Sequence, residues 1–447
     1  MIQVSRALIR ELKTVFSRGL GITSRQTGPP VEFLVDQHAL RVRTRNQQVA
    51  LEYRLPAEGL ENQHLVAPFG LLRCCHGPKA DLVQIQRQEK AIQVKWQEAG
   101  IPQSMEYPTA ECREFPTLPD KLDRNASRLM DALRDACETA TEDSARYALD
   151  HLQLRGSEGQ VISTDGRQLL VQDGFQFPWD GELLVPVNRL LCSRELRRGK
   201  SVEIGRTADW VALRSGAWTI WLRIDAKARF PDVLELVNNR PEAVASLQIP
   251  DEDGEFICAA LKPKPFHQDD AGKVTLDLNG KVTVRTRDAG QGQQRDYVLC
   301  RSERSGESLR ANTSRDYFRR ALQLGFREIS LSGSDTPASC RDDHRIYVWA
   351  LLTQADALQP QPDAVLIEST SVSHQAAQSR KKQKQVTERV PSGKKPSVEA
   401  EQVLTQMKSL CGGLTETVSH IRDLMAQLHT QSQGWSHGLT SDQRVGT

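Results

Sequence analysis

The 447-residue sequence has few aromatic residues, which make up 5% of the chain, and no long apolar run. No stretch approaches the roughly 20 apolar residues that a membrane helix needs, and the N-terminus lacks the basic and apolar regions of a signal peptide. A P-loop, GxSxG, HExxH and GxGxxG are absent as well. We therefore expect a cytoplasmic protein without catalytic activity.

The 9 cysteines are scattered and form no CxxC spacing, and none of the 10 histidines stands beside them in a zinc-binding pattern. These spacings predict free thiols, with no metal and no cofactor. The net charge of +2 and the pI of about 8.1 define no partner class, because basic and acidic faces can cancel in the total.

The length exceeds what a single hydrophobic core usually supports, and one order of elements recurs three times. In each copy a helix precedes alternating strands, and a second helix precedes further strands. The expected helices span residues 5–18, 68–76, 126–141, 187–198, 253–261 and 314–324. We predict domains at 1–120, 121–244 and 245–352, with prolines at Phe115-Pro116 and Phe230-Pro231 marking the two connections.

The remainder of the chain differs in composition. Residues 353–397 are predicted to form a low-complexity basic linker, because Lys and Arg dominate its charged residues and few apolar residues occur. Residues 398–430 carry apolar side chains at the heptad spacing of a coiled-coil helix, and 431–447 are expected to be a disordered tail. The partner of this helix stays open.

Three motifs of the middle repeat stand at distinctive distances: Arg146-Tyr147-x-Leu149, Thr164-Asp165-Gly166-x-x-Leu169 and Phe230-Pro231-Asp232. With them the middle repeat resembles the second domain of the bacterial DNA polymerase III beta subunit, the sliding clamp. The third repeat resembles the last domain of that family through residues 312–322 and 346–352, and the first resembles its opening domain by pattern. The chain thus resembles a divergent member with a C-terminal extension.

The resemblance implies an α+β fold of three tandem clamp domains, each with helices on one face of antiparallel sheet. The three domains would form a crescent, and two crescents would close head to tail into a homodimeric ring around double-stranded DNA. Such a ring is not an enzyme. It holds a DNA polymerase or repair proteins on the DNA, and polymerase and clamp-loader subunits bind it through short peptides. A cytoplasmic, nucleoid-associated location follows.

Sliding requires contacts between cations and phosphates without base recognition. The cations that the resemblance and the predicted helices offer for DNA binding are Arg6, Arg10, Lys13, Arg73, Arg194, Arg197, Arg198, Arg315, Arg319 and Arg320. Each could equally belong to an ordinary solvated helix face.

The family binds peptides in an apolar cleft between its second and third domains. Carried over by position, that cleft comprises Leu149, Thr164, Gly166, Leu169, Pro231, Leu236, Val348, Trp349 and Leu351. The alternative is that these are core residues of alternating strands.

The chain also departs from the family pattern. Arg167-Gln168 stands where the family typically has His-Arg, and the opening helix of the middle repeat carries Asp131, Asp135 and Glu138. Acidic groups weaken DNA retention. A second hypothesis is therefore a clamp-derived interaction scaffold that does not encircle DNA and acts through its C-terminal helix.

Overall fold

The computed structural model describes residues 1–370 except 58, 60, 78–80, 90, 112–113, 142–146, 263–271 and 288–291. Residues 1–372 form one compact unit. The predicted heptad helix 398–430, the tail 431–447 and the linker beyond residue 370 lie outside the described residues. Across the described part of the chain, no helix has the length and apolar character to cross a membrane.

The first helix of repeat 1, residues 2–108, is one that the sequence specifies well. The Ser5 hydroxyl caps it by accepting the Leu8 N–H, and Ile9, Leu12, Val15 and Phe16 are buried along one face. The elements are β1 (Ile2–Ser5), α1 (Arg6–Gly19), β2 (Val31–Val35), β3 (Ala39–Arg45), β4 (Val49–Pro56), β5 (Gln63–Ala67), α2 (Gly70–Cys74), β6 (Leu82–Arg87), β7 (Ala91–Glu98) and β8 (Ile101–Pro108).

Repeat 2, residues 123–223, repeats this order with one change. Its elements are β9 (Asp123–Ala126), α3 (Arg128–Thr139), β10 (His151–Arg155), β11 (Gln160–Thr164), β12 (Gln168–Gln172), β13 (Glu182–Pro186), η1 (Arg189–Cys192), η2 (Glu195–Arg198), β14 (Ser201–Arg206), β15 (Trp210–Ser215) and β16 (Trp218–Arg223). The predicted helix 187–198 is thus wrong: two short 3-10 turns replace it, because Ser193 adopts an extended conformation between them.

Repeat 3, residues 245–349, follows the short helix α4 (Leu234–Asn238). Its elements are β17 (Ala245–Gln248), α5 (Asp251–Ala260), β18 (Lys273–Asp277), β19 (Thr283–Arg287), β20 (Gln294–Val298), β21 (Glu303–Gly306), β22 (Arg310–Ser314), α6 (Arg315–Gln323), β23 (Glu328–Leu331), β24 (Ala338–Arg341) and β25 (Arg345–Trp349). The α+β class, with mostly antiparallel sheet, is confirmed.

Each repeat contributes two four-stranded sheets, an A sheet from its first half and a B sheet from its second half. The A sheets have the orders β5-β2-β3-β4, β13-β10-β11-β12 and β22-β18-β19-β20, and the B sheets β1-β6-β7-β8, β9-β14-β15-β16 and β17-β23-β24-β25. Strand β21 extends the third B sheet beyond β17. One face of each sheet supplies the core, and the largest core cluster contains residues of repeats 1 and 2.

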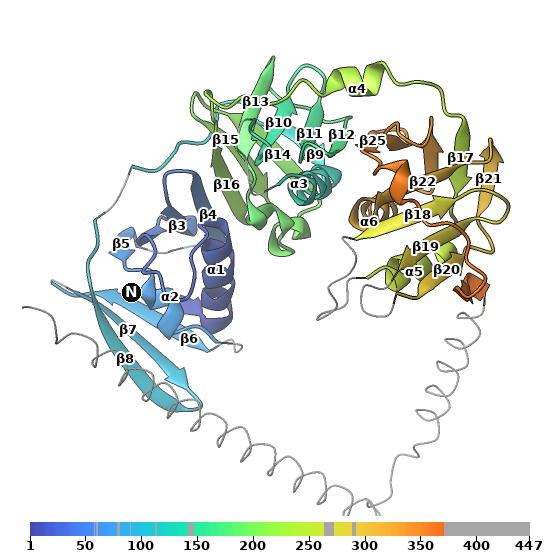
Figure 1. The fold of residues 1–447 in the computed structure, drawn as a ribbon. Helices are drawn as coiled ribbons and strands as arrows, with labels where there is room; N and C mark the ends of the chain where they lie inside the picture. The colour runs from blue at the N-terminus through green and yellow to red at the C-terminus, as the bar shows by residue number, and fades with distance from the viewer. Residues whose placement is uncertain are drawn as a thin grey trace, which may run out of the picture. The chain divides into compact units, whose positions relative to one another are not determined.

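Backbone pairing across repeats joins an A sheet to the following B sheet. Strand β4 pairs antiparallel with β16, from Val49↔Leu222 to Tyr53↔Trp218, and β12 pairs with β25, from Gln168↔Trp349 to Gln172↔Arg345. Figure 1 shows β4 beside β16 and β12 beside β25. The last strand of an A sheet therefore meets the last strand of the next repeat's B sheet at both junctions.

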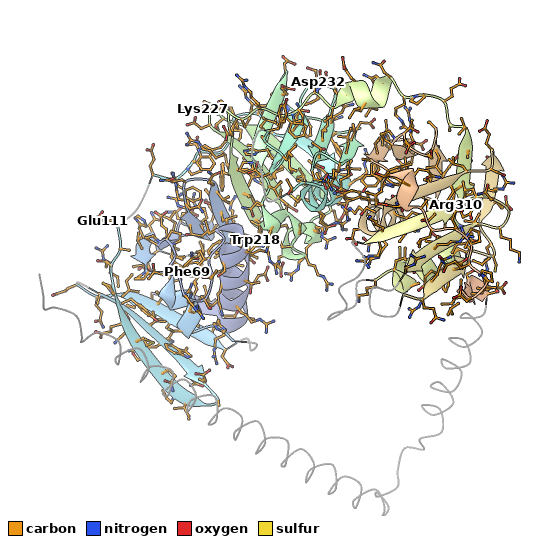
Figure 2. All side chains as sticks on the ribbon, viewed as in Figure 1. Phe69, Glu111, Trp218, Lys227, Asp232 and Arg310 are labelled. Atoms are coloured by element: carbon orange, nitrogen blue, oxygen red, sulfur yellow. The ribbon has the colours of Figure 1, made fainter. Side chains whose placement is uncertain are left out.

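Aromatic side chains cover the junctions. Trp218 of β16, labelled in Figure 2, packs edge-on against Phe16 and Tyr53, with ring centroids 5.8 and 4.8 Å away. On the opposite face of this junction Phe115 lies edge-on to Trp221 at 5.1 Å. Phe230 packs against the aliphatic cluster of the second junction. The two predicted connections thus run over the two junctions.

The segment from residue 353 to 370 differs from the predicted linker. It contains a 3-10 turn, η3 (Gln354–Asp356), and the strand β26 (Val365–Glu368), which pairs in parallel with β20. The prediction missed this strand because the apolar run Val365-Leu366-Ile367 is short and shows no alternation.

Candidate functional site

A positive patch lies at the exposed side of α1. Arg10 is exposed, and Lys13 places its Nζ 2.9 Å from Nε2 of His76. Burial lowers the pKa of His76, and the charges of Lys13, Arg6 and Arg10 lower it further. His76 is therefore neutral at pH 7 and can accept a hydrogen bond from Lys13, so it adds no positive charge to the patch.

Arg6 is not available at the surface of α1. Its side chain is buried, and its guanidinium donates to the carbonyl oxygens of Cys75, His76 and Gln97 and to the carboxylate of Glu98. These acceptors use the donors that a phosphate would need. The sequence-based assignment of Arg6 is corrected on this ground: it fixes α1 to the loop after α2 and to β7.

Other predicted cations differ in availability. Arg73 donates to the carbonyl oxygens of Thr23 and Ser24, while Arg194 is exposed at the start of η2. Arg198 contacts Glu11 of α1 at 3.1 Å, and Arg197 lies 3.5 Å from Asp131. Exposed ion pairs of this kind exchange readily with solvent and other anions. Arg10, Lys13, Arg194 and Arg198 are thus the most available cations of the predicted set.

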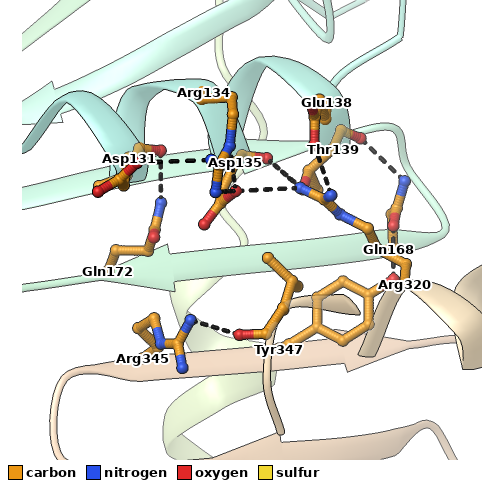
Figure 3. Close-up of polar contacts among 12 residues, drawn as sticks. Asp131, Arg134, Asp135, Glu138, Thr139, Gln168, Gln172, Arg320, Arg345 and Tyr347 are labelled. Atoms are coloured by element: carbon orange, nitrogen blue, oxygen red, sulfur yellow. Dashed lines mark hydrogen bonds and ion pairs between the residues drawn. The ribbon is translucent and has the colours of Figure 1, made fainter. Parts of the chain in front are cut away.

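The acidic side chains of α3 hold arginines from three elements, as Figure 3 shows in part. Arg134 contacts Asp135 at 2.7 Å, Arg197 contacts Asp131, and Arg320 of α6 donates to Glu138 at 2.6 Å. Arg320 also donates to the Asp135 carbonyl oxygen at 2.9 Å. Arg320 is therefore a link between repeats 2 and 3 rather than a free cation.

The remaining two arginines of α6 are half-buried. Arg319 donates to the Cys258 carbonyl oxygen at 3.2 Å and lies 3.8 Å from Asp316, and Arg315 lies 3.7 Å from the same carboxylate. They connect α6 to α5 and to their own helix. Repeat 3 consequently offers less free positive charge than the sequence suggests.

The Thr164-Asp165-Gly166 motif forms a hairpin turn whose side chains hold repeats 2 and 3 together. Gly166 has φ +88°, a conformation that favours glycine, and Asp165 accepts the N–H groups of Arg167 and Gln168. Asp165 also accepts the Tyr317 hydroxyl at 3.1 Å. Burial, together with the Asp165 charge, raises the pKa of Tyr317 to about 12, so its hydroxyl stays protonated and donates.

Gln168 completes this junction and was missed as a functional position. Its amide donates to the Thr139 carbonyl oxygen at 3.0 Å, and its carbonyl oxygen accepts the Tyr347 hydroxyl at 2.6 Å (Figure 3). The only signal in the sequence was its departure from the family pattern. Within this chain Gln168 connects α3, β12 and β25.

An apolar cluster marks the face of the β12–β25 junction where the cleft was predicted. Leu169 and Val348 are buried together there with Ile162, Val171 and Val233. Partly buried side chains complete its rim: Phe230, Leu234, Val237 and Ile346. The structure thus brings two of the predicted cleft residues together, and adds a set from the connection 230–237 that sequence reasoning named only through Pro231 and Leu236.

Four other residues of the predicted cleft lie outside this buried cluster. Leu149 lies near the Gly166 turn, Pro231 is half-buried, and Leu236 on α4 is exposed. Thr164 is buried and donates its hydroxyl to the Gln168 carbonyl oxygen at 2.6 Å. Its role is therefore to fix the turn.

One residue of the predicted cleft, Trp349, belongs to the core of repeat 3 instead. Trp349 is completely buried and donates its indole N–H to Thr313 at 2.8 Å, and Leu351 packs against the same core. Successive side chains of a strand point to opposite faces, so Val348 faces the cleft cluster while Trp349 faces inward. The assignment of Trp349 to the cleft is corrected accordingly, and that of the partly buried Leu351 stays a prediction.

Among the described residues, no group of three or more His, Cys, Asp or Glu side chains could hold a metal ion. The interface candidates are therefore the cationic α1 and η2 surface and the apolar β12–β25 cluster.

Solved structures with this fold are DNA polymerase III beta subunits. That of Pseudomonas aeruginosa is 20% identical, with a TM-score of 0.62, over 78% of this chain and 99% of that chain. Those of Streptococcus pyogenes and Thermotoga maritima are each 12% identical, with TM-scores of 0.63 and 0.62, over 79% of this chain and 99% of theirs. No family model and no curated protein matches the sequence. The chain has the sliding-clamp fold.

Proposed function

We propose that the protein is a DNA sliding clamp that encircles duplex DNA as a head-to-tail homodimer. The observation that carries this proposal is the way the sheets pair between consecutive repeats, which we call the junction rule. Strands β4 and β12 end their A sheets and pair with β16 and β25, which end the next B sheets. By the same rule β20, which ends the third A sheet, matches β8 of a second copy, which ends the first B sheet. Two copies joined twice in this way form a closed ring.

A closed ring retains DNA by topology, so its contacts with the duplex can be weak and independent of sequence. Arg10, Lys13, Arg194 and Arg198 supply cations for phosphates, and no element of the fold is needed to read base edges. A non-catalytic role in polymerase processivity follows. With this role we also propose that the protein is located in the cytoplasm, bound to DNA.

The apolar β12–β25 cluster is the proposed docking site for DNA polymerase, clamp-loader or repair proteins. Phe230, Leu234, Val237 and Ile346 are only partly buried there, and short peptides bind such grooves through a few apolar anchors. The exposed Leu236 on α4 is a further candidate contact.

Retention on circular DNA tests the proposal. The protein, loaded on nicked circular DNA with or without a clamp loader, should stay bound in high salt and leave when the DNA is cut. Topological retention is insensitive to counterions, whereas phosphate contacts weaken with salt. Dissociation that depends on salt alone, and is the same for circular and linear DNA, would contradict ring closure.

Neutralising the positive surface should weaken the initial contact with DNA. We expect the triple variant R10Q/K13Q/R194Q to lower the slope of log K against log salt by about one unit per lost phosphate contact. The variant R54Q/R87Q/K95Q, which removes the same charge from exposed strand residues, is the matched control. Equal slopes for both triple variants would mean that the α1 and η2 surface does not face DNA.

The second candidate is a clamp-derived scaffold acting through residues 398–430. The observation that favours it is the pairing of α3 carboxylates with Arg134, Arg197 and Arg320, which reduces free positive charge. Deleting 398–430 separates the two. A clamp dimerises without these residues, whereas a scaffold joined by its C-terminal helix becomes monomeric.

A further inference from the structure

The segment after repeat 3, which we call the C-terminal strap (residues 353–369), crosses the outer face of the third A sheet. It begins beside β22, where Asn312 donates to the Thr353 carbonyl oxygen at 3.1 Å. Over β18, Asp356 contacts Lys273 at 2.7 Å, and Leu358 N–H donates to Thr275. Gln294 of β20 then donates to the Gln359 carbonyl oxygen at 2.9 Å.

The strap ends on the edge of β20. Its strand β26 pairs in parallel from Arg295↔Val365 to Val298↔Glu368, and beyond it Ser369 accepts the Cys300 N–H at 3.0 Å. The other edge of β20 is paired with β19. Because a strand has only two edges, β26 uses the backbone groups that any additional strand would need.

This edge is the one at which the junction rule places a second copy. We propose that the C-terminal strap is an exchangeable strand: β26 closes the β20 edge within one chain, and β8 of a second copy displaces it when the ring closes. The proposal rests on the head-to-tail dimer proposed above. It adds that the dimer forms by exchange of a parallel strand within the chain for an antiparallel strand between chains.

The contacts of the strap with the sheet are of a kind that costs little to break. Beneath it lie polar side chains that water can satisfy, including Asp277, Arg285 and Asp296. Hydrogen bonds exchanged for water contribute little net stability. Two of the four β26 side chains add little burial, since Leu366 is 63% and Val365 is 36% exposed, whereas Ile367 packs partly buried against the core of repeat 3.

The incoming strand is available. On the described residues, β8 pairs with β7 along one edge and with no strand along the other. It is eight residues long, twice the four of β26, and exposes Ile101 and Met105. Long, uncovered strand edges tend to pair with other chains. Strand β8 is therefore long enough to cover the four-residue stretch of β20 that β26 pairs with.

A single substitution can lock the strap. Thr370 Oγ1 lies 3.7 Å from Sγ of the exposed Cys300, so Thr370→Cys places a thiol beside a native one. We expect the oxidised full-length variant to be monomeric at micromolar concentration by sedimentation velocity, and dithiothreitol to restore dimerisation. Mass spectrometry verifies the disulfide. Thr370→Ser, treated in the same way, is the control because it cannot cross-link.

A double substitution in β26 should release the strap. Consecutive N–H groups of a strand point to opposite edges, so L366P/I367P removes whichever donor faces β20. Dimerisation should tighten about tenfold or more, because the released state no longer has to be populated first. The control L366A/I367V keeps both N–H groups. Adding I101K/M105K to the released variant should abolish the dimer, since lysines on an edge oppose pairing.

The outcomes separate this inference from the proposed function. A locked monomer and a tighter released dimer that requires β8 support strand exchange. Equal dimerisation of the oxidised and reduced forms overturns the strand exchange but does not contradict the proposed clamp function. A released variant that stays monomeric at every concentration overturns the exchange together with the homodimeric ring.

Discussion

Replacing Arg285 by alanine should destabilise repeat 3 by about 3–5 kcal/mol at neutral pH, because it leaves buried carboxylates without their main partner. Arg285 contacts Asp296 at 3.0 Å and also pairs with Asp277, which Arg310 approaches at 3.2 Å. The side chains of Arg285 and Asp277 are 7% and 4% exposed. Urea unfolding of the full-length variant and the wild type measures the difference.

The loss should shrink in acid. Burial raises the pKa of Asp277, but the Asn279 N–H and the charges of Arg285 and Arg310 outweigh burial and hold the pKa below its ordinary value. A carboxyl with a depressed pKa stabilises the fold above its unfolded-state pKa of about 3.9, and this contribution is lost as pH falls through the folded-state pKa. The stability difference should therefore be full near pH 7 and decline below about pH 4.

Lys281→Ala provides the control, since Lys281 is 78% exposed and its contact with Glu368 is 4.0 Å long. It should change the free energy of unfolding by less than about 0.5 kcal/mol. A similarly small effect of Arg285→Ala, unchanged between neutral and acid pH, would show that the carboxylates are already hydrated and that the strap does not cover them.

Trp349→Ala should cost about 3–5 kcal/mol of stability through the cavity that it leaves. The indole is fully buried, stacks on Tyr347 at 5.3 Å between ring centroids and donates to Thr313. Thermal and urea unfolding should both report the loss. A cleft residue behaves differently: its truncation weakens peptide binding and leaves folding intact.

Leu236→Ala is the comparison for that distinction. Leu236 is 57% exposed, so its truncation should leave the melting temperature nearly unchanged. If Trp349→Ala folded as stably as the wild type while losing a bound peptide, the inward position of Trp349 would be contradicted.

Much of the fold could be predicted because its strands alternate and its main helices carry clear apolar stripes. The α1 face of Ile9, Leu12 and Phe16 is one example, and the motifs of the middle repeat, set in the repeated order of elements, indicated the clamp fold. The helix expected at 187–198 failed because local apolar spacing cannot reveal the extended Ser193 that divides it. Strand β26 could not be predicted from the sequence, because its extended structure depends on pairing with β20, which is distant in the sequence.

The candidate site was harder to predict because orientation and pairing decide function. Val348 and Trp349 are neighbours in the sequence, yet one faces the apolar cluster and the other the core. Arg6 and Arg10 lie on the same helix, yet only Arg10 is exposed. Residue type and motif spacing determine neither property, because both depend on contacts with other elements.

The pairing of β26 with the outer edge of β20 has a consequence for polymer growth. Interfaces in which different surfaces meet head to tail either close into rings or continue as open filaments. A protomer that keeps β26 in place has β8 free but β20 covered. It can therefore terminate a growing filament at one end, and it cannot accept the next subunit.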